Sequence, residues 1–434
     1  MTILHKTKLH SNPNVQIINN GGNFTANGGL ALVSEYLDKI GFARLIDQQI
    51  HFDDPRKFKE HSNSDILLQI LFQLISGYKN DSSANFLQND PALKLLFNKQ
   101  KLASQPTVSR FLKRVTQANI TELNDIIEYL VDIVIEKNNQ QEMIIDVDST
   151  HTDTYGYQEN ANYNAHYQTN GYHPLIAFDG ITGMLLATKL RPGNVYTSNG
   201  IVDFINPILS HYRNHSCDMN ILVRGDSGFS SGELYQLCDQ QESKFLIKLK
   251  ANRKLQSIAE HSVLYGGDIP ISESEVQYFE LKYQPDTWAK PYRVVLKAVR
   301  QAGELLFDYE FLVTNLYSTS ITDVFKMYHK RGIVENSIKE LKDGFFMDKT
   351  DSHSFKVNSI RAILSALAFN IIQSMKRLAL PATESCEQIN TLRLQLFRIP
   401  AKIVQHARSK IIQLSRFNVY DRLFWRVLKR IDMI

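Results

Sequence analysis

The sequence has little cysteine, proline or glycine, with 3, 12 and 20 of these residues in 434. Three scattered cysteines cannot form a disulfide framework, which favours a reducing compartment. The low proline and glycine content excludes collagen-like, linker-rich and low-complexity architectures. The chain is 43% hydrophobic and 10% aromatic, so it can bury the cores of two or three domains.

Long apolar runs and several common enzyme motifs are also missing. The first residues contain no apolar segment typical of a signal peptide, and the longest uncharged apolar run, 362–375, is shorter than the ~20 residues of a membrane span. The sequence has no Gly-Lys dipeptide, CxxC, HExxH or GxSxG, which excludes a Walker-type nucleotide loop and the common zinc and serine-hydrolase motifs. We therefore expect a cytoplasmic, nucleoid-associated protein with no membrane partner.

Positive charge is concentrated at the end of the chain. The formal net charge is +4, but residues 391–434 contain ten Lys or Arg and two Asp, a local charge of +8. The remaining residues therefore carry −4. A basic tail on a near-neutral body favours a polyanion partner, most simply nucleic acid, although such tails are often only solvated surfaces.

Residues 1–140 have mainly helical patterns. Residues 64–76 predict a buried helix, and residues 121–139 predict an amphipathic one. Residues 104–115 begin with a serine and an early proline, typical of a helix start, and then carry Ser109, Arg110, Lys113 and Arg114. Short polar and basic residues there are typical of a helix-turn-helix recognition helix, but an ordinary solvated face explains them equally well.

After residue 141 the pattern changes to alternating strands and helices. Apolar, β-branched runs at 143–150, 172–190, 219–226 and 244–250, with a helix after Ser230, indicate an α/β domain over residues 141–250. Three long strand patterns without an intervening helix then predict an all-β insertion over 251–318. Helical character returns in 319–380, followed by a basic C-terminal region, 381–434.

Acidic residues stand at the ends of two predicted core strands. In IIDVDST, Asp146 and Asp148 share one face, because strand side chains alternate, and Asp226 ends the strand in LVRGDSGF. Carboxylates at neighbouring strand ends are what Mg²⁺ needs, since it takes oxygen ligands. The alternative is that these aspartates only cap turns.

A third carboxylate lies in YHKRGIVENSIKELK. On one continuous helix Tyr328, Arg331, Glu335 and Lys342 would fall within an arc of about 60°. An acid between cations is suited to a phosphodiester with bound metal, although an exposed ion-pair face is a simpler explanation.

The spacing Y-x2-R-x3-E-x6-K resembles the signature of insertion-sequence DDE transposases of the cut-and-paste, hairpin-forming branch. The context is similar: Asp148 is followed by Ser149 and Thr150, and Asp226 follows a later apolar strand. The resemblance extends in architecture over about residues 15–415. It implies an α/β fold with an RNase H-like catalytic core interrupted by an all-β insertion, a helical N-terminal region and a basic C-terminal tail.

The same resemblance implies roles for individual residues. Asp148, Asp226 and Glu335 would be catalytic and would hold two Mg²⁺ ions, with Mn²⁺ as a substitute; Asp148 is favoured over Asp146 because of the Ser-Thr that follows it. Tyr328, Arg331 and Lys342 would hold DNA phosphates. Trp288 would stack on a flipped base, unless it is only a structural tryptophan.

The resulting hypothesis is a transposase that binds the inverted-repeat ends of its own element, cuts them and joins them to target DNA. Its partners would be double-stranded DNA, as transposon ends and as target, and a second copy of the chain, because synapsis requires two ends. The alternatives are an RNase H-like nuclease without strand transfer and a catalytically inert DNA-binding inhibitor.

Overall fold

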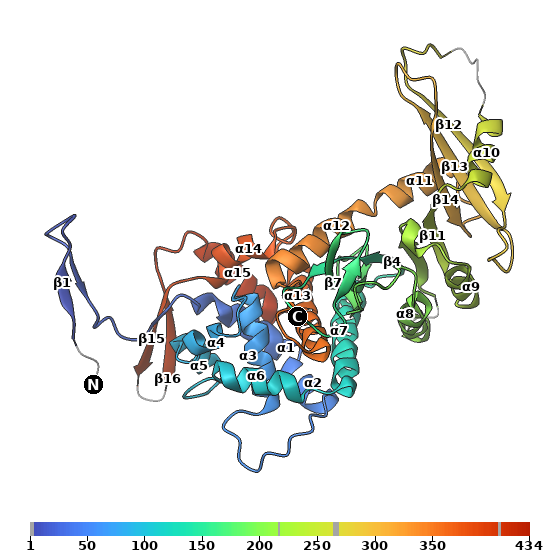
Figure 1. Ribbon diagram of the computed structural model, residues 1–434. Helices are drawn as coiled ribbons and strands as arrows, with labels where there is room; N and C mark the ends of the chain where they lie inside the picture. The colour runs from blue at the N-terminus through green and yellow to red at the C-terminus, as the bar shows by residue number, and fades with distance from the viewer. Residues whose placement is uncertain (1–3, 216–217, 264–268, 407–408) are drawn as a thin grey trace. The chain divides into compact units, whose positions relative to one another are not determined.

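The computed structural model describes residues 4–215, 218–263, 269–406 and 409–434 (Figure 1). The chain folds into two compact units, which we call the terminal unit (residues 1–119 and 375–434) and the central unit (residues 120–374). The two ends of the sequence therefore belong to one unit.

The terminal unit is built mainly from helices. They are α1 (Ala31–Lys39), α2 (Phe42–Gln49), α3 (Asn63–Ile75), α4 (Ser83–Leu87), α5 (Pro91–Leu96), α6 (Gln105–Arg114), α14 (Ile389–Leu392) and α15 (Asp421–Asp432), with a 3-10 turn η1 (Gly28–Leu30) and a π-helical turn η4 (Arg393–Phe397). Helix α3 is fixed at its start by a reciprocal cap: the Ser62 hydroxyl accepts from the Asp65 backbone N–H at 3.0 Å, and the Asp65 carboxylate accepts from the Ser62 N–H at 2.9 Å.

The terminal unit also contains strands from both ends of the chain. They are β1 (Lys6–Lys8), β2 (Gln16–Ile18), β3 (Phe24–Thr25), β15 (Ala401–His406) and β16 (Ser409–Leu414). β1 and β2 form a hairpin, and β3 joins the hairpin of β15 and β16 in a three-stranded antiparallel sheet. The first 140 residues are therefore not purely helical.

The basic C-terminal region is folded and partly buried. Arg393 is 3% exposed, and its guanidinium donates to the carbonyls of Leu74 and Ile75, both at 2.7 Å, at the end of α3. Arg398 donates to the Ser76 carbonyl at 3.3 Å. These two arginines therefore bind carbonyl oxygens at the carboxyl end of α3.

The central unit is organised around an eight-stranded mixed sheet with the order β12-β13-β14-β11-β10-β4-β8-β9. The strands are β4 (Glu142–Ser149), β8 (Leu175–Asp179), β9 (Leu185–Lys189), β10 (Asn220–Gly225), β11 (Lys244–Leu249), β12 (Glu275–Tyr283), β13 (Tyr292–Arg300) and β14 (Asp308–Thr314). β4, β10 and β11 are parallel, and their connections contain the helices α8 (Ile201–His215) and α9 (Gly232–Gln240). A small sheet of β5 (Thr152–Asp153), β7 (Thr169–Tyr172) and β6 (Asn162–Asn164) follows the end of β4.

The segment 251–318 differs from the predicted all-β insertion. It begins with helix α10 (Arg253–Ser262), whose first turn is capped by Asn252, with its side chain accepting from the Leu255 N–H at 2.9 Å. Its three strands do not form a separate sheet, because β14 pairs with β11 in antiparallel register (yellow in Figure 1). The segment therefore extends the central sheet.

Two long helices flank the central unit in sequence, α7 (Gln117–Lys137) and α13 (Phe355–Leu378). Among the described residues, α13 alone is long and apolar enough to cross a membrane by length and composition, but 78% of its apolar window is buried inside the folded protein. This burial is what a core helix of a folded domain shows.

Candidate active site

Two of the predicted acids lie side by side at the carboxyl ends of adjacent parallel strands. β4 and β10 pair with Val147 opposite Gly225, so Asp148 and Asp226 occupy the next matching positions and the same face. Adjacent strands lie about 4.8 Å apart. The Asp226 carboxylate accepts from the Gly228 N–H at 2.9 Å and starts the 3-10 turn η2 (Ser227–Phe229). The apolar strands thus bring these two acids together.

The structure separates the roles of Asp146 and Asp148. Asp146 is fully buried and pairs with the Arg224 guanidinium, with Nε–Oδ1 at 2.5 Å and Nη2–Oδ2 at 2.6 Å. Asp148 lies at the strand end, and its side chain is 14% exposed. Only Asp148 of the two can therefore receive an external ligand.

The motif spacing predicted one continuous helix, but the signature segment is divided. It consists of α11 (Ile321–His329), α12 (Gly332–Lys339) and the π-helical turn η3 (Glu340–Gly344). Between α11 and α12 the Arg331 N–H donates to the Tyr328 carbonyl at 2.9 Å, a spacing of three residues that tightens the turn. The helix that carries the motif is therefore interrupted at residues 330–331 and ends in a π-helical turn.

Two motif cations nevertheless reach the end of β4. The Arg331 guanidinium contacts the Asp148 carboxylate, Nη2–Oδ2, at 2.9 Å. The Lys342 ammonium donates to the carbonyl of His151 at 2.8 Å and to the hydroxyl of Thr150 at 3.3 Å. The acids of the strands and the cations of the signature segment therefore meet at one strand end.

Negative charge is crowded around Asp148. Burial raises the pKa of Asp148 to about 6, with the carboxylates of Asp226 and Glu335 adding to the increase and the Arg331 guanidinium opposing it. The same charges act on Tyr328: burial first, then Asp226, raise its pKa to about 12. A cation at this place would relieve the repulsion between the acids.

The third acid and the phenol differ in their exposure. Glu335 is exposed in the first turn of α12, where it still influences the pKa of Asp148. Tyr328 is only 8% exposed and packs in an apolar cluster with neighbours that include Leu222, Leu246 and Phe325. Most of the Tyr328 ring is therefore core.

The donor chemistry fits a divalent metal, although no closed site is formed. Asp148, Asp226 and Glu335 supply carboxylate oxygens, the ligands that Mg²⁺ takes. Within the described residues, no three His, Cys, Asp or Glu side chains are grouped closely enough to hold an ion. The fit thus rests on donor type, strand register and the raised pKa of Asp148.

Trp288 is a core residue in this structure and does not form an open stacking platform. It is 7% exposed, and its ring contacts the rings of Tyr235, Tyr283 and Tyr292 at centroid distances of 5.1, 5.6 and 5.8 Å. Aromatic packing accounts for the residue. Because the indole is enclosed by aromatic neighbours, stacking on a flipped base would require this cluster to open.

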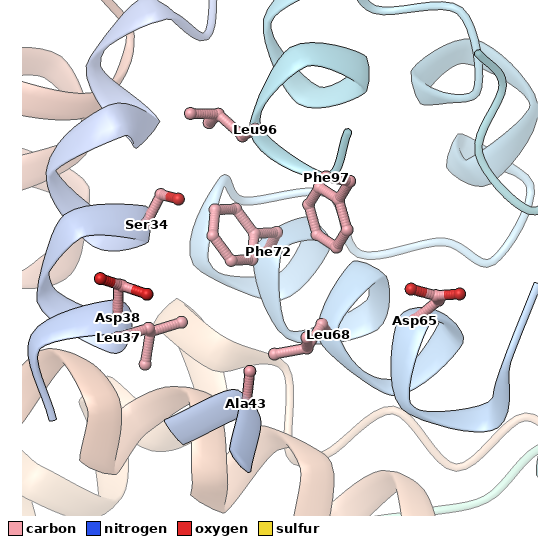
Figure 2. A pocket seen from close by; sticks show the side chains of 9 residues that line it. All are labelled: Ser34, Leu37, Asp38, Ala43, Asp65, Leu68, Phe72, Leu96 and Phe97. Carbon is pink, nitrogen blue, oxygen red and sulfur yellow. The ribbon is translucent and has the colours of Figure 1, made fainter. Parts of the chain in front are cut away.

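Two cavities lie in the terminal unit. One of about 240 Å³ in the terminal unit is lined by apolar side chains including Leu68 and Phe72, with Asp38 and Asp65 also on its wall (Figure 2). Another, of about 460 Å³, is lined partly by Arg416 and Trp425. Neither cavity is lined by a predicted catalytic residue.

Comparison with known protein families identifies the family of the chain. The profile of the family "Transposase DDE domain group 1" matches residues 7–434. The chain therefore belongs to this family, and it is a DDE transposase. No curated protein matches the sequence.

Among solved structures, similarity is found to transposase complexes. The synaptic complex of piggyBac transposase with hairpin DNA has a TM-score of 0.44 and 9% identity, over 85% of this chain and 77% of that chain. The Mos1 transposase paired-end complex with the left transposon end has a TM-score of 0.18 and 10% identity, over 47% of this chain and 64% of that chain.

Sequence reasoning missed Arg224. It is among the largest fully buried side chains of the described residues. The sequence did contain a signal for this pair, because an arginine in an apolar strand requires a buried acid. Asp146 and Arg224 each lie two residues before a predicted metal ligand, Asp148 and Asp226 respectively.

Proposed function

We propose that this transposase binds the inverted-repeat ends of its own element, cleaves them with a divalent metal and joins them to target DNA. The observation that carries the proposal is the meeting of Asp148 and Asp226, on adjacent strands, with Arg331 and Lys342 from the signature segment. The strand order β9-β8-β4-β10-β11, in which β8 is antiparallel to both of its neighbours β4 and β9, is that expected of an RNase H-like core.

Asp148, Asp226 and Glu335 would hold the metal. Bound there, two Mg²⁺ ions, or Mn²⁺ in their place, would activate the attacking oxygen and stabilise the leaving oxygen of an in-line displacement. A carboxylate must be ionised to ligate. Because the pKa of Asp148 is about 6, we expect metal binding to weaken as the pH falls through 6.

Arg331 and Lys342 would hold the phosphates of the cleaved strand. Both cations lie at the end of β4, Arg331 on Asp148 and Lys342 on backbone and hydroxyl oxygens. A guanidinium can donate two parallel hydrogen bonds to a phosphate, and an ammonium supplies a point charge. Tyr328, with most of its ring in the core, would present only its hydroxyl end to the site.

The terminal unit would supply binding to the transposon ends and contacts between two copies in the synaptic complex. On α6, Arg110 and Lys113 are exposed, whereas Arg114 donates to the Asn63 side chain at 2.9 Å and is partly buried. The exposed cations of this helix and of the C-terminal region would contact DNA phosphates.

The test is a gel assay with a labelled duplex bearing the element's end, a target plasmid and Mg²⁺. We expect the wild type to give both cleaved and joined products. Glu335→Gln should abolish both, while Asp286→Asn, at an exposed loop carboxylate of the same unit, should not. Cleavage without joining would indicate a nuclease, and binding without cleavage an inert inhibitor; either result would refute the proposal.

A further inference from the structure

One buried ion pair lies directly beneath the two strand-end acids. Asp146 on β4 and Arg224 on β10 are register partners, 0% and 2% exposed in their side chains, and they form a two-pronged contact. Asp148 and Asp226 are the next residues on the same face of the same strands. At about 3.3 Å per residue, the pair lies roughly 6.6 Å below the acids.

The pair also binds the element that carries the signature. The third nitrogen of the Arg224 guanidinium, Nη1, donates to the carbonyl of Met327, near the end of α11. Met327 immediately precedes Tyr328, and Arg331, the partner of Asp148, follows four residues later. One guanidinium thus connects β4, β10 and α11, three of the elements that contribute residues to the site.

A glycine, Gly180, lies directly against the Asp146–Arg224 pair. Gly180 follows β8, and its N–H donates to the Ile144 carbonyl at 2.7 Å. A Cβ atom at Gly180 would lie 2.5 Å from Asp146 Oδ2 and 3.3 Å from Arg224 Nη2. A side chain at position 180 would therefore displace the carboxylate of Asp146.

A buried ion pair of this kind is a poor source of stability, because the desolvation of two charges offsets their attraction. Replacing such a pair by apolar side chains of similar volume often leaves the free energy of unfolding unchanged or increases it. The pair does fix direction and distance, because the planar guanidinium has one orientation that satisfies a carboxylate and a carbonyl together.

We propose that Asp146 and Arg224 are positioning residues that hold Asp148, Asp226 and the start of α12 in the arrangement needed to bind a divalent metal. The proposal rests on the proposed function and adds to it a supporting layer one step beneath the ligands. Removing such supporting contacts in metal sites lowers metal affinity by about 10- to 100-fold.

The experiment compares Arg224→Lys with Arg300→Lys in the full chain. Arg300 and Glu275 are a matched control: they are register partners on neighbouring strands of the same sheet, 7% and 11% exposed, with Nη2–Oε2 at 2.8 Å. Mn²⁺ affinity is measured by the electron paramagnetic resonance of free Mn²⁺, and unfolding of each variant by urea. Both substitutions should reduce stability, but only Arg224→Lys should weaken Mn²⁺ binding, by at least about tenfold.

Two further variants keep the test decisive if Arg224→Lys fails to fold. Asp146→Leu with Arg224→Met should recover stability without recovering Mn²⁺ affinity. Gly180→Ala keeps both charges and should still weaken Mn²⁺ binding, because its methyl group displaces the pair. Wild-type Mn²⁺ affinity in either variant would overturn the inference, as would equal losses in the Arg224 and Arg300 variants. Failure of the wild type itself to bind Mn²⁺ would overturn the proposed function as well.

Discussion

Replacing Asp148 by Asn should stabilise the metal-free protein at neutral pH. In the folded protein burial and neighbouring carboxylates raise the pKa of Asp148 from 3.8 to about 6. The folded state therefore disfavours the charged form of this carboxyl more than the unfolded state does. Asn resembles the protonated form, so it avoids this penalty.

The size and sign of the effect follow from proton linkage. A raised carboxyl pKa means that the folded state binds more protons between the two pKa values, so stability falls as the pH rises from 3.8 to about 6. A pKa raised from 3.8 to about 6 corresponds to about 3 kcal/mol near pH 7, and to well under about 1 kcal/mol at pH 4. The gain from Asp148→Asn should therefore nearly vanish in acid.

The assay is urea unfolding of the central unit with EDTA present, at pH 7.5 and pH 4. The chain has two tryptophans, and Trp288 is buried in the central unit. In a Trp425→Phe background, indole fluorescence therefore reports that unit alone. Asp286→Asn, at an exposed carboxylate, is the control and should change stability little at either pH. An Asp148→Asn variant that is no more stable at pH 7.5, or equally stabilised at pH 4, would refute the reasoning.

Three other predictions concern the DNA-facing residues. Glu335→Gln should abolish Mg²⁺-dependent nicking but leave end binding in a gel shift unchanged, because Glu335 is exposed and away from the core; wild-type nicking would remove it from the ligand set. Arg331→Lys should slow nicking by about tenfold or more with end binding retained, since an ammonium cannot form the two-pronged phosphate contact; full activity would show that charge alone suffices. The third change replaces Lys410 and Arg416, both exposed, and Arg408, which lies outside the described residues, by Gln. It should weaken end binding and flatten the slope of log affinity against log salt by up to about three. An unchanged slope would assign these residues to packing.

The strands of the central unit could be predicted because apolar runs of five to nine residues are a local property. The three strand patterns predicted within residues 251–318 are observed as β12, β13 and β14. The helix α10 was readable too, from the Asn252 cap and the spacing of Leu255 and Ala259. It was missed because strong strand patterns follow it.

Features that depend on distant residues could not be predicted. Trp288 is buried by Tyr235 and Tyr292, and no local pattern distinguishes such a tryptophan from an exposed one. The local sequence also does not indicate the break before Gly332 or the π-helical turn after Lys339. An ideal helical period assigns motif residues to one face only where the hydrogen bonding remains regular.

Arg331 and Lys342 both contact the end of β4 although the helix that carries them is interrupted. Both cations contact the four-residue stretch from Asp148 to His151, Arg331 through the carboxylate and Lys342 through backbone and hydroxyl oxygens. The π-helical turn inserts an extra residue into the helical ladder and so rotates the residues after it. Lys342 lies within that turn, so its direction depends on the irregularity. A substitution that restores a regular helix there would turn Lys342 away from Thr150 even though the motif spacing remained intact.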